Sequence, residues 1–267
     1  MAAGTTPKSP WFTQASGYPE QPTTWWKGRR VGGVAIGIVQ LEARIPMPPG
    51  DIGNASTFDF PILFDTLGDV DPHLILADEP NDEVTEVILT TIERLEMQGV
   101  RAVVGNCGFF ANYQPQVATR TKVPFYSSSL MLLPMIIASL GADQKVGVLT
   151  ADGPKLKRAP AIANCGVSEE AMQRLVIYGA EECPQMKNVV GEVGEWDLQA
   201  FEGELIGVAK DMLREHPDIS TILLECTEFP VVAHALQEEV QMPIWGYPDL
   251  VNWIQGGVVR RPFSGWI

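Results

Sequence analysis

Hydrophobic positions follow two alternating patterns from residue 31 onward. Short runs rich in Val, Ile and Leu predict strands, and longer segments with apolar residues three or four positions apart predict helices. The strands are predicted at Val31–Leu41, Val70–Leu76, Ala102–Gly105, Val123–Tyr126, Val146–Thr150, Leu175–Tyr178, Thr221–Leu224 and Pro243–Trp245. The helices are predicted at Asn81–Gln98, Ser129–Leu140, Ser168–Arg174, Leu198–Glu215 and Val231–Val240. This alternation indicates an α/β fold with mainly parallel sheets covered by helices.

The sequence contains a weak internal repeat. Gly33–Val39 and Lys145–Thr150 both have the character of the first strand of a sheet, and each is followed downstream by a strand that ends in a cysteine. We therefore expect two similar α/β lobes, residues 31–145 and 146–240, related by pseudo-twofold symmetry. Residues 241–267 are expected to cross back to the first lobe.

The segment before residue 31 is rich in Pro, Ser, Thr and Trp and has no period. It predicts an extended arm over residues 1–30 that lies on the body or on a neighbouring subunit, with a disordered tail as the alternative. Since an aromatic arm needs a surface to cover, we expect a homo-oligomer, a dimer or a tetramer.

Charge narrows the class of partner. The chain has 19 Lys and Arg against 33 Asp and Glu, a formal net charge of −14. A surplus of this sign argues against nucleic acid and against an anionic membrane surface as partners. Apolar stretches fall short of a membrane span, and the N-terminus lacks the apolar region of a signal peptide, so a cytoplasmic location is expected.

Two of the four cysteines stand in matching contexts. Cys107 and Cys226 each follow a predicted buried strand, at the strand end where open α/β sheets bind ligands. A thiolate and a thiol on opposite sides of a substrate can remove a proton beside a carboxylate and return it, without metal or cofactor. The alternative is that both thiols are packing residues. Cys165 and Cys183 lack such a context and are interpreted as structural, and no spacing typical of a metal site is present.

These motifs carry a family resemblance. GNCGF at 105–109 and LECTEFP at 224–230 resemble the two cysteine motifs of the aspartate/glutamate/hydantoin racemase superfamily. PPGDI at 48–52, STF at 56–58 and VPFYSSSL at 123–130 are similar to the branch that contains algal dimethylsulfoniopropionate lyases and bacterial relatives. The resemblance implies a pseudo-symmetric two-domain α/β fold, no cofactor, and Cys107 and Cys226 as catalytic residues.

The resemblance and the strand-end positions also suggest residues that bind a small carboxylic acid. They are Gln40, Asn106, Gly108, Phe109, Ser127, Ser128, Thr150, Thr227 and Glu228. For some of these a simpler interpretation stays open: Gln40 in a solvated loop, the serines as helix caps, and Thr150 beside a plain turn. One departure concerns the substrate, because many amino-acid racemases of the superfamily have Thr directly after the first cysteine, where this chain has Gly108.

Three functions remain open from the sequence. The favoured one is a cofactor-independent racemase or epimerase that removes a proton α to the carboxylate of an amino acid or related small acid. The second is a β-elimination of the dimethylsulfoniopropionate lyase type, which gives dimethyl sulfide and acrylate. The third is a non-catalytic small-molecule binding protein.

Overall fold

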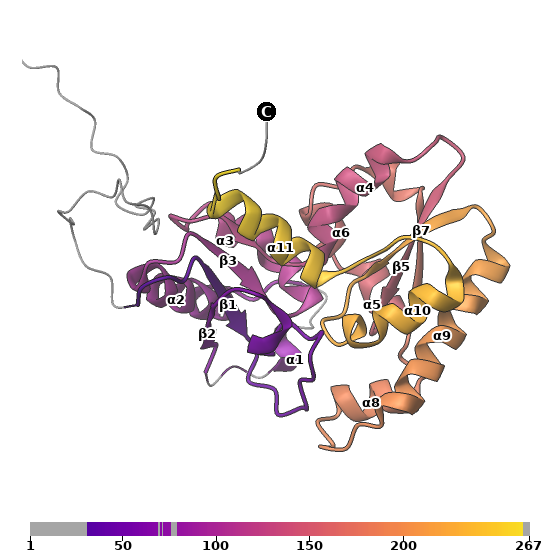
Figure 1. Ribbon diagram of the computed structural model, residues 1–267, viewed down its shortest axis with the longest axis horizontal. Helices are drawn as coiled ribbons and strands as arrows, with labels where there is room; N and C mark the ends of the chain where they lie inside the picture. The colour runs from indigo at the N-terminus through magenta and orange to yellow at the C-terminus, as the bar shows by residue number, and fades with distance from the viewer. Residues whose placement is uncertain (1–30, 69, 71, 76–78, 264–267) are drawn as a thin grey trace, which may run out of the picture.

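Two parallel four-stranded sheets, flanked by helices, lie side by side in the computed structural model, which describes residues 31–68, 70, 72–75 and 79–263 (Figure 1). The first sheet has the order β2-β1-β3-β4 and the second the order β6-β5-β7-β8. All six strand pairings are parallel, and the two orders are the same. The predicted α/β fold with two similar lobes is therefore confirmed. The predicted arm over residues 1–30 lies outside the described residues.

The strands and helices follow the predicted alternation closely. The strands are β1 (Ile36–Gln40), β2 (Ile62–Thr66), β3 (Ala102–Gly105), β4 (Phe125–Tyr126), β5 (Lys145–Thr150), β6 (Leu175–Gly179), β7 (Ile219–Leu224) and β8 (Ile244–Trp245). The α-helices are α1 (Pro72–Ile75), α2 (Asp82–Gln98), α3 (Gln114–Ala118), α4 (Leu133–Ser139), α5 (Gly153–Arg158), α6 (Ala161–Asn164), α7 (Glu169–Met172), α8 (Pro184–Val190), α9 (Leu198–Glu215), α10 (Ala233–Val240) and α11 (Tyr247–Val258). The 3₁₀ turns are η2 (Ala55–Thr57), η3 (Gly108–Tyr113), η4 (Ser129–Leu132) and η5 (Phe229–Val232).

The two long helices have clear local causes. The Asn81 side chain accepts hydrogen bonds from the first backbone amides of α2, and Gly99 ends this helix with φ +97°. Asp197 caps α9 in the same way. Neither helix, nor any other in the described part of the chain, is both long and apolar enough to cross a membrane.

One strand prediction was wrong. Val70–Leu76 was predicted as a strand, but its described part contains the short helix α1, and the strand of this region is β2. Pro72 has no N–H for a sheet ladder, and its fixed φ suits the first turn of a helix. β2 is an edge strand whose residues are all only half-buried.

The two lobes share a core. Val146 and Val148 of β5 point to the same side of the second sheet and pack with the core of the first lobe. The alternate residue Leu149 packs on the other side with residues of α9, such as Leu205. Ser129 of η4 also donates a hydrogen bond to the Leu224 carbonyl of β7. The junction between the lobes is therefore a packed interface.

The C-terminal segment contributes to both lobes. β8 extends the second sheet, whereas α11 lies over the first lobe, against β3 and η4 (Figure 1). Arg101, just before β3, donates to the Val258 carbonyl at the end of α11. Tyr126 of β4 meets Trp253 of α11 edge to face.

Candidate functional site

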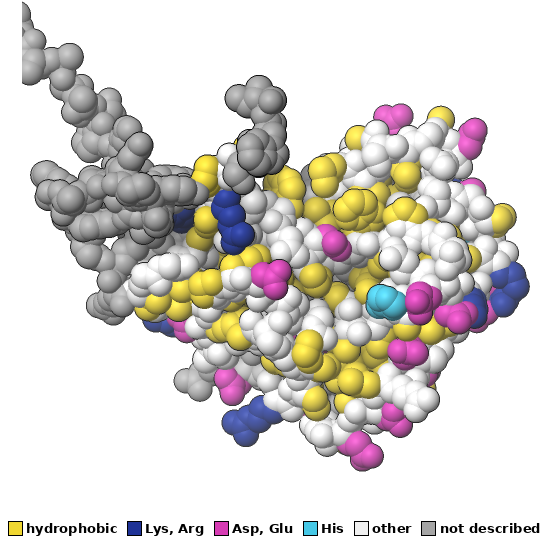
Figure 2. All heavy atoms as spheres, viewed as in Figure 1, with side chains coloured by type: hydrophobic (Ala, Val, Ile, Leu, Met, Phe, Trp, Pro, Cys, Tyr) yellow, Lys and Arg dark blue, Asp and Glu magenta, His cyan; other side chains and the backbone are white. Residues whose placement is uncertain are grey.

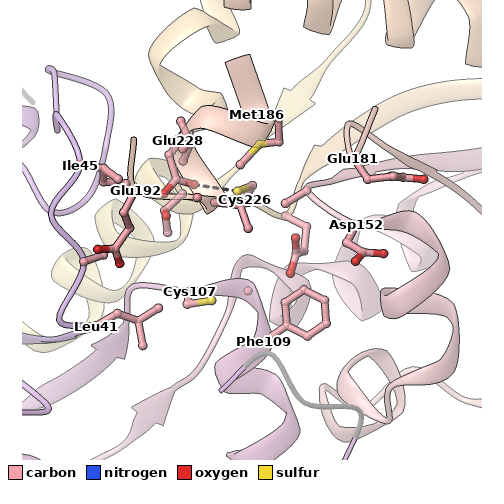
Figure 3. A pocket seen from close by; sticks show the side chains of 18 of the residues that line it. Leu41, Ile45, Cys107, Phe109, Asp152, Glu181, Met186, Glu192, Cys226 and Glu228 are labelled. Carbon is pink, nitrogen blue, oxygen red and sulfur yellow. Dashed lines mark hydrogen bonds between the residues drawn. The ribbon is translucent and has the colours of Figure 1, made fainter. Parts of the chain in front are cut away.

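A cavity of about 690 Å³ lies at the junction of the two lobes, at the carboxyl ends of β3 and β7. Its lining comes from both halves of the chain: the segment after β1 and the start of η3 on one side, and the segments after β5, β6 and β7 on the other. Figure 3 shows Cys107 and Cys226 within this pocket, with Phe109, Met186 and several carboxylates around them. The structure thus brings the two predicted thiols to one cavity.

Cys107 is held by the turn that starts directly after it. It occupies the N-cap position of η3 in extended conformation, and its carbonyl accepts a hydrogen bond from the Phe110 amide. Burial raises the pKa of this thiol far above its ordinary value, and the nearby carboxylates of Glu225 and Glu228 raise it further. The raised pKa of Cys107 therefore favours its neutral thiol form.

Cys226 comes from the opposite lobe and has a carboxylate partner. Its thiol donates to Oε2 of Glu228, with 2.7 Å between the sulfur and the oxygen. Burial raises the pKa of Cys226 most, followed by the negative charges of Glu228 and Glu225. Both thiols are thus protonated at rest, and Cys226 has an acceptor for its proton within reach.

The other predicted binding residues divide into two groups. Asn106, Gly108, Phe109, Thr227 and Glu228 line the cavity. Asn106 also fixes the segment after β1, since its Oδ1 accepts a hydrogen bond from the Leu41 amide.

Gln40, Ser127, Ser128 and Thr150 are not among the residues that line the cavity. Ser128 caps η4 by accepting a hydrogen bond from the Leu130 amide, which is the simpler interpretation of this residue. Ser127 is fully buried and its amide donates to Gln114. Thr150 donates to Glu225 over 2.7 Å and so supports a residue that does line the cavity.

Glu225 is the site residue that sequence reasoning missed. Its side chain is 1% exposed, and burial together with Glu228 and Asp152 raises its pKa to about 7, against the lowering effect of the Thr150 hydrogen bond. The sequence signal was a carboxylate that directly follows the apolar run of β7, where a buried strand rarely carries a charge.

The cavity carries an excess of acidic side chains. Asp152, Glu181, Glu192, Glu225 and Glu228 line it, against Lys155 and Lys187. Both lysines have carboxylate partners, since Lys155 lies 3.7 Å from Asp152 and Lys187 lies 2.8 Å from Glu182. Acidic side chains are also spread over the second lobe on the face in Figure 2. The pocket favours a ligand that brings a positive charge.

A loop from the first lobe closes against the Cys226 motif. Asp51 in this loop is 2% exposed, and burial and the charge of Glu228 raise its pKa to about 8. Gly50 has φ +109°, and a β-carbon there would lie 2.8 Å from the Cα of Val231 in η5. The loop therefore packs directly on the turn that follows Cys226.

Groups of three or more His, Cys, Asp or Glu side chains that could hold a metal ion are absent from the part of the chain that the structure describes.

Comparison with known proteins gives two kinds of similarity. No protein-family model matches the chain. Dimethylsulfoniopropionate lyase 3 of Emiliania huxleyi is 27% identical over 237 residues, which cover 86% of this chain and 61% of that protein. A dimethylsulfoniopropionate lyase of Durusdinium sp. clade D is 27% identical over 236 residues, covering 86% of this chain and 77% of its own length. The chain thus spans about three fifths of the first of these relatives.

Solved structures share the fold. A glutamate racemase from Bacillus anthracis superposes with a TM-score of 0.53 and 15% identity over 84% of this chain and 82% of its own. Unliganded arylmalonate decarboxylase superposes with a TM-score of 0.51 and 18% identity, over 84% of this chain and 92% of its own. An aspartate racemase homologue from Pyrococcus horikoshii superposes with a TM-score of 0.52 and 16% identity, over 81% of this chain and 94% of its own. At these identities the similarity is one of fold.

Proposed function

Since the chain has the two-lobed fold of the aspartate/glutamate racemase superfamily and is similar in sequence to its dimethylsulfoniopropionate lyase branch, we propose that it is an enzyme that removes a proton α to a carboxylate. Cys107 and Cys226 are its acid–base pair. The observation that carries this proposal is that the two thiols come from opposite lobes and line one cavity.

The acidic excess of the cavity directs the proposal to a cationic acid. Both thiols resist ionisation because of burial and nearby carboxylates. A substrate with a sulfonium or ammonium group offsets that negative charge and so favours the thiolate. The best candidate substrates are therefore zwitterions with a cationic group on the β-carbon.

The reaction we propose is a β-elimination. The Cys226 thiol transfers its proton to Glu228, and the thiolate takes the proton from the α-carbon. The electron pair of that C–H bond forms the alkene, and the C–S bond to the sulfonium breaks with its pair on sulfur. A neutral sulfide and an alkenoate leave. The Cys107 thiol stabilises the carbanion from the other face by hydrogen bonding.

Racemisation remains the second candidate, because the same two thiols come from opposite lobes and line one pocket. In that reaction Cys107 donates its proton to the other face of the carbanion. Gly108, which follows Cys107 where many amino-acid racemases of the superfamily have Thr, argues against aspartate or glutamate as its substrate.

The proposal is tested with matched substrates in deuterated water, followed by NMR. The panel contains dimethylsulfoniopropionate, its trimethylammonium analogue, and a set of amino acids. We expect elimination from the sulfonium compound and, because an amine leaves far less readily, only α-hydrogen exchange with the ammonium analogue. Inversion of an amino acid without elimination would favour the racemase. Binding of an acid without exchange or product would instead indicate a binding protein and overturn the proposal.

A further inference from the structure

Glu225 has one paired and one unpaired carboxyl oxygen. Its amide donates to the Leu149 carbonyl, so its backbone continues the pairing between β7 and β5 and is fixed by the sheet. Oε2 accepts the hydrogen bond from Thr150. Oε1 is buried and has no hydrogen-bond partner among the described residues. A buried acceptor without a partner is costly, which indicates that this oxygen serves a ligand.

The unpaired oxygen lies against the first cysteine motif. A β-carbon built on Gly108 would lie 1.6 Å from Oε1, so this oxygen takes the space that a side chain at position 108 would need. Glu225 therefore extends from the second lobe to the residue that follows Cys107. Its unpaired oxygen sits where the two cysteine motifs meet.

The surroundings of Glu225 favour its neutral form. The titratable groups that face it are thiols, carboxyls and a phenol, from five different segments. They are Cys107 after β3, Cys226 after β7, Glu228 before η5, Asp152 before α5, Cys165 after α6 and Tyr247 at the start of α11. Because Thr150 already donates to Oε2, the proton of a neutral Glu225 belongs on Oε1.

We propose that Glu225 is a further catalytic residue: its neutral carboxyl donates a hydrogen bond from Oε1 to the substrate carboxylate. This inference rests on the proposed function. When the α-proton leaves, negative charge moves onto the substrate carboxylate, and a donor already in place stabilises that charge. The proton of Glu225 stays on Glu225 throughout, and the thiolate receives the α-proton.

The first test compares Glu225→Gln with Glu225→Ala. Gln keeps a neutral donor of the same shape and an acceptor for Thr150, so we expect kcat within about tenfold of the wild type at pH 6. Ala removes the donor, so we expect a loss of about 10²–10³ in kcat. Glu225 could act instead as an ionised carboxylate, either as a base or as the anchor of the substrate cation. In that case Glu225→Gln would lose as much kcat as Glu225→Ala, and the inference would be wrong.

The pH profile separates catalysis from a structural role. Since the neutral form is active, wild-type kcat falls as pH rises through the pKa of Glu225 at about 7, and Glu225→Gln lacks this fall. Thr150→Val removes the hydrogen bond that lowers this pKa, so the fall moves to higher pH. An unchanged profile in both variants would contradict the inference.

A spectroscopic measurement keeps the inference distinct from the proposed function. Infrared difference spectra of the wild type against Glu225→Gln detect the C=O band of a protonated carboxyl without any turnover. We expect this band at pH 6 and its loss by pH 8. A band already lost at pH 5 would overturn the inference even if the enzyme eliminates sulfide. A band at pH 6 with no exchange on any acid would instead count against the proposed function alone.

Discussion

The sulfur of Cys226 lies 2.7 Å from Oε2 of Glu228, two residues further along the same motif. The carboxylate both accepts the thiol's hydrogen bond and, by its negative charge, raises the pKa of that thiol. The pair therefore keeps Cys226 protonated at rest while providing an acceptor for its proton.

We predict that Glu228→Gln lowers the pKa of Cys226, because it removes the negative charge that opposes the thiolate. The rate of alkylation by iodoacetamide against pH, read for each cysteine by peptide mass spectrometry, measures this. We expect faster alkylation of Cys226 in the variant at the same pH. Cys183 is the internal control, since its raised pKa comes from burial, Glu204 and Glu181. An unchanged Cys226 rate would show that Glu228 does not control the thiol.

The second prediction concerns the two thiols. Cys107→Ser and Cys226→Ser should each lower kcat by about 10²–10⁴, because a hydroxyl is a far weaker acid than a thiol. Turnover of whichever acid shows exchange is the measurement. Cys183→Ser, outside the cavity lining, is the matched control and keeps wild-type activity. Near-normal activity in Cys107→Ser or in Cys226→Ser would rule out the two-thiol mechanism.

The third prediction tests the contact between Gly108 and Glu225. Gly108→Ala places a methyl group into the Glu225 carboxyl, and overpacking of this kind costs about 1–3 kcal/mol of unfolding free energy. Combining it with Glu225→Ala frees the space, so the double variant should be more stable than the sum of the two single changes predicts. Urea denaturation of all four proteins gives the coupling. Strict additivity would mean that the two residues do not compete for space.

The fourth prediction uses the raised pKa of Asp51. A folded pKa of about 8 against an ordinary 3.8 means that neutral Asp51 stabilises the fold fully at pH below 3.8. That contribution falls as pH rises toward 8, by at most about 1.4 kcal/mol per pH unit. Asp51→Asn, which can still accept from the Gly53 amide, should therefore gain stability relative to the wild type between pH 5 and pH 8.

Urea denaturation of both proteins across this range measures the difference. Asp59→Asn, at an exposed position of the same region, controls for the change in net charge. If the difference in unfolding free energy between Asp51→Asn and the wild type stayed constant with pH, Asp51 would already be ionised in the folded protein.

Much of the scaffold could be predicted because its signals are local. The apolar runs of β3 and β7 and the period of α9 are strong, and their predicted positions agree with the structure to within two residues. Helices that begin with a Pro in the first turn were harder to predict. The run Asp152-Gly153-Pro154 suggested a turn, yet Asp152 caps α5 by accepting from the Lys155 amide.

The site was only partly predictable because its parts lie far apart in the sequence. The two cysteines could be found because each has a local signal, a buried strand that ends at the thiol. The role of Gly108 could not, since its reason is the Glu225 carboxyl of the other lobe. Thr150 was predicted to bind substrate, and its hydroxyl donates to Glu225 of the same lobe, a contact that the sequence did not indicate. The contact of Gly108 depends on how the lobes pack.

The two sheets repeat one strand order, yet the residues that follow their third strands differ: Gly108 comes after Cys107, and Thr227 after Cys226. A molecule held between the lobes would therefore meet chemically unequal surroundings on its two sides. For a substrate with a CH₂ group beside its carboxylate, the two prochiral hydrogens would not be equivalent, and abstraction would select one of them. The unequal neighbours of the two thiols would thus give a reaction between the lobes a handedness.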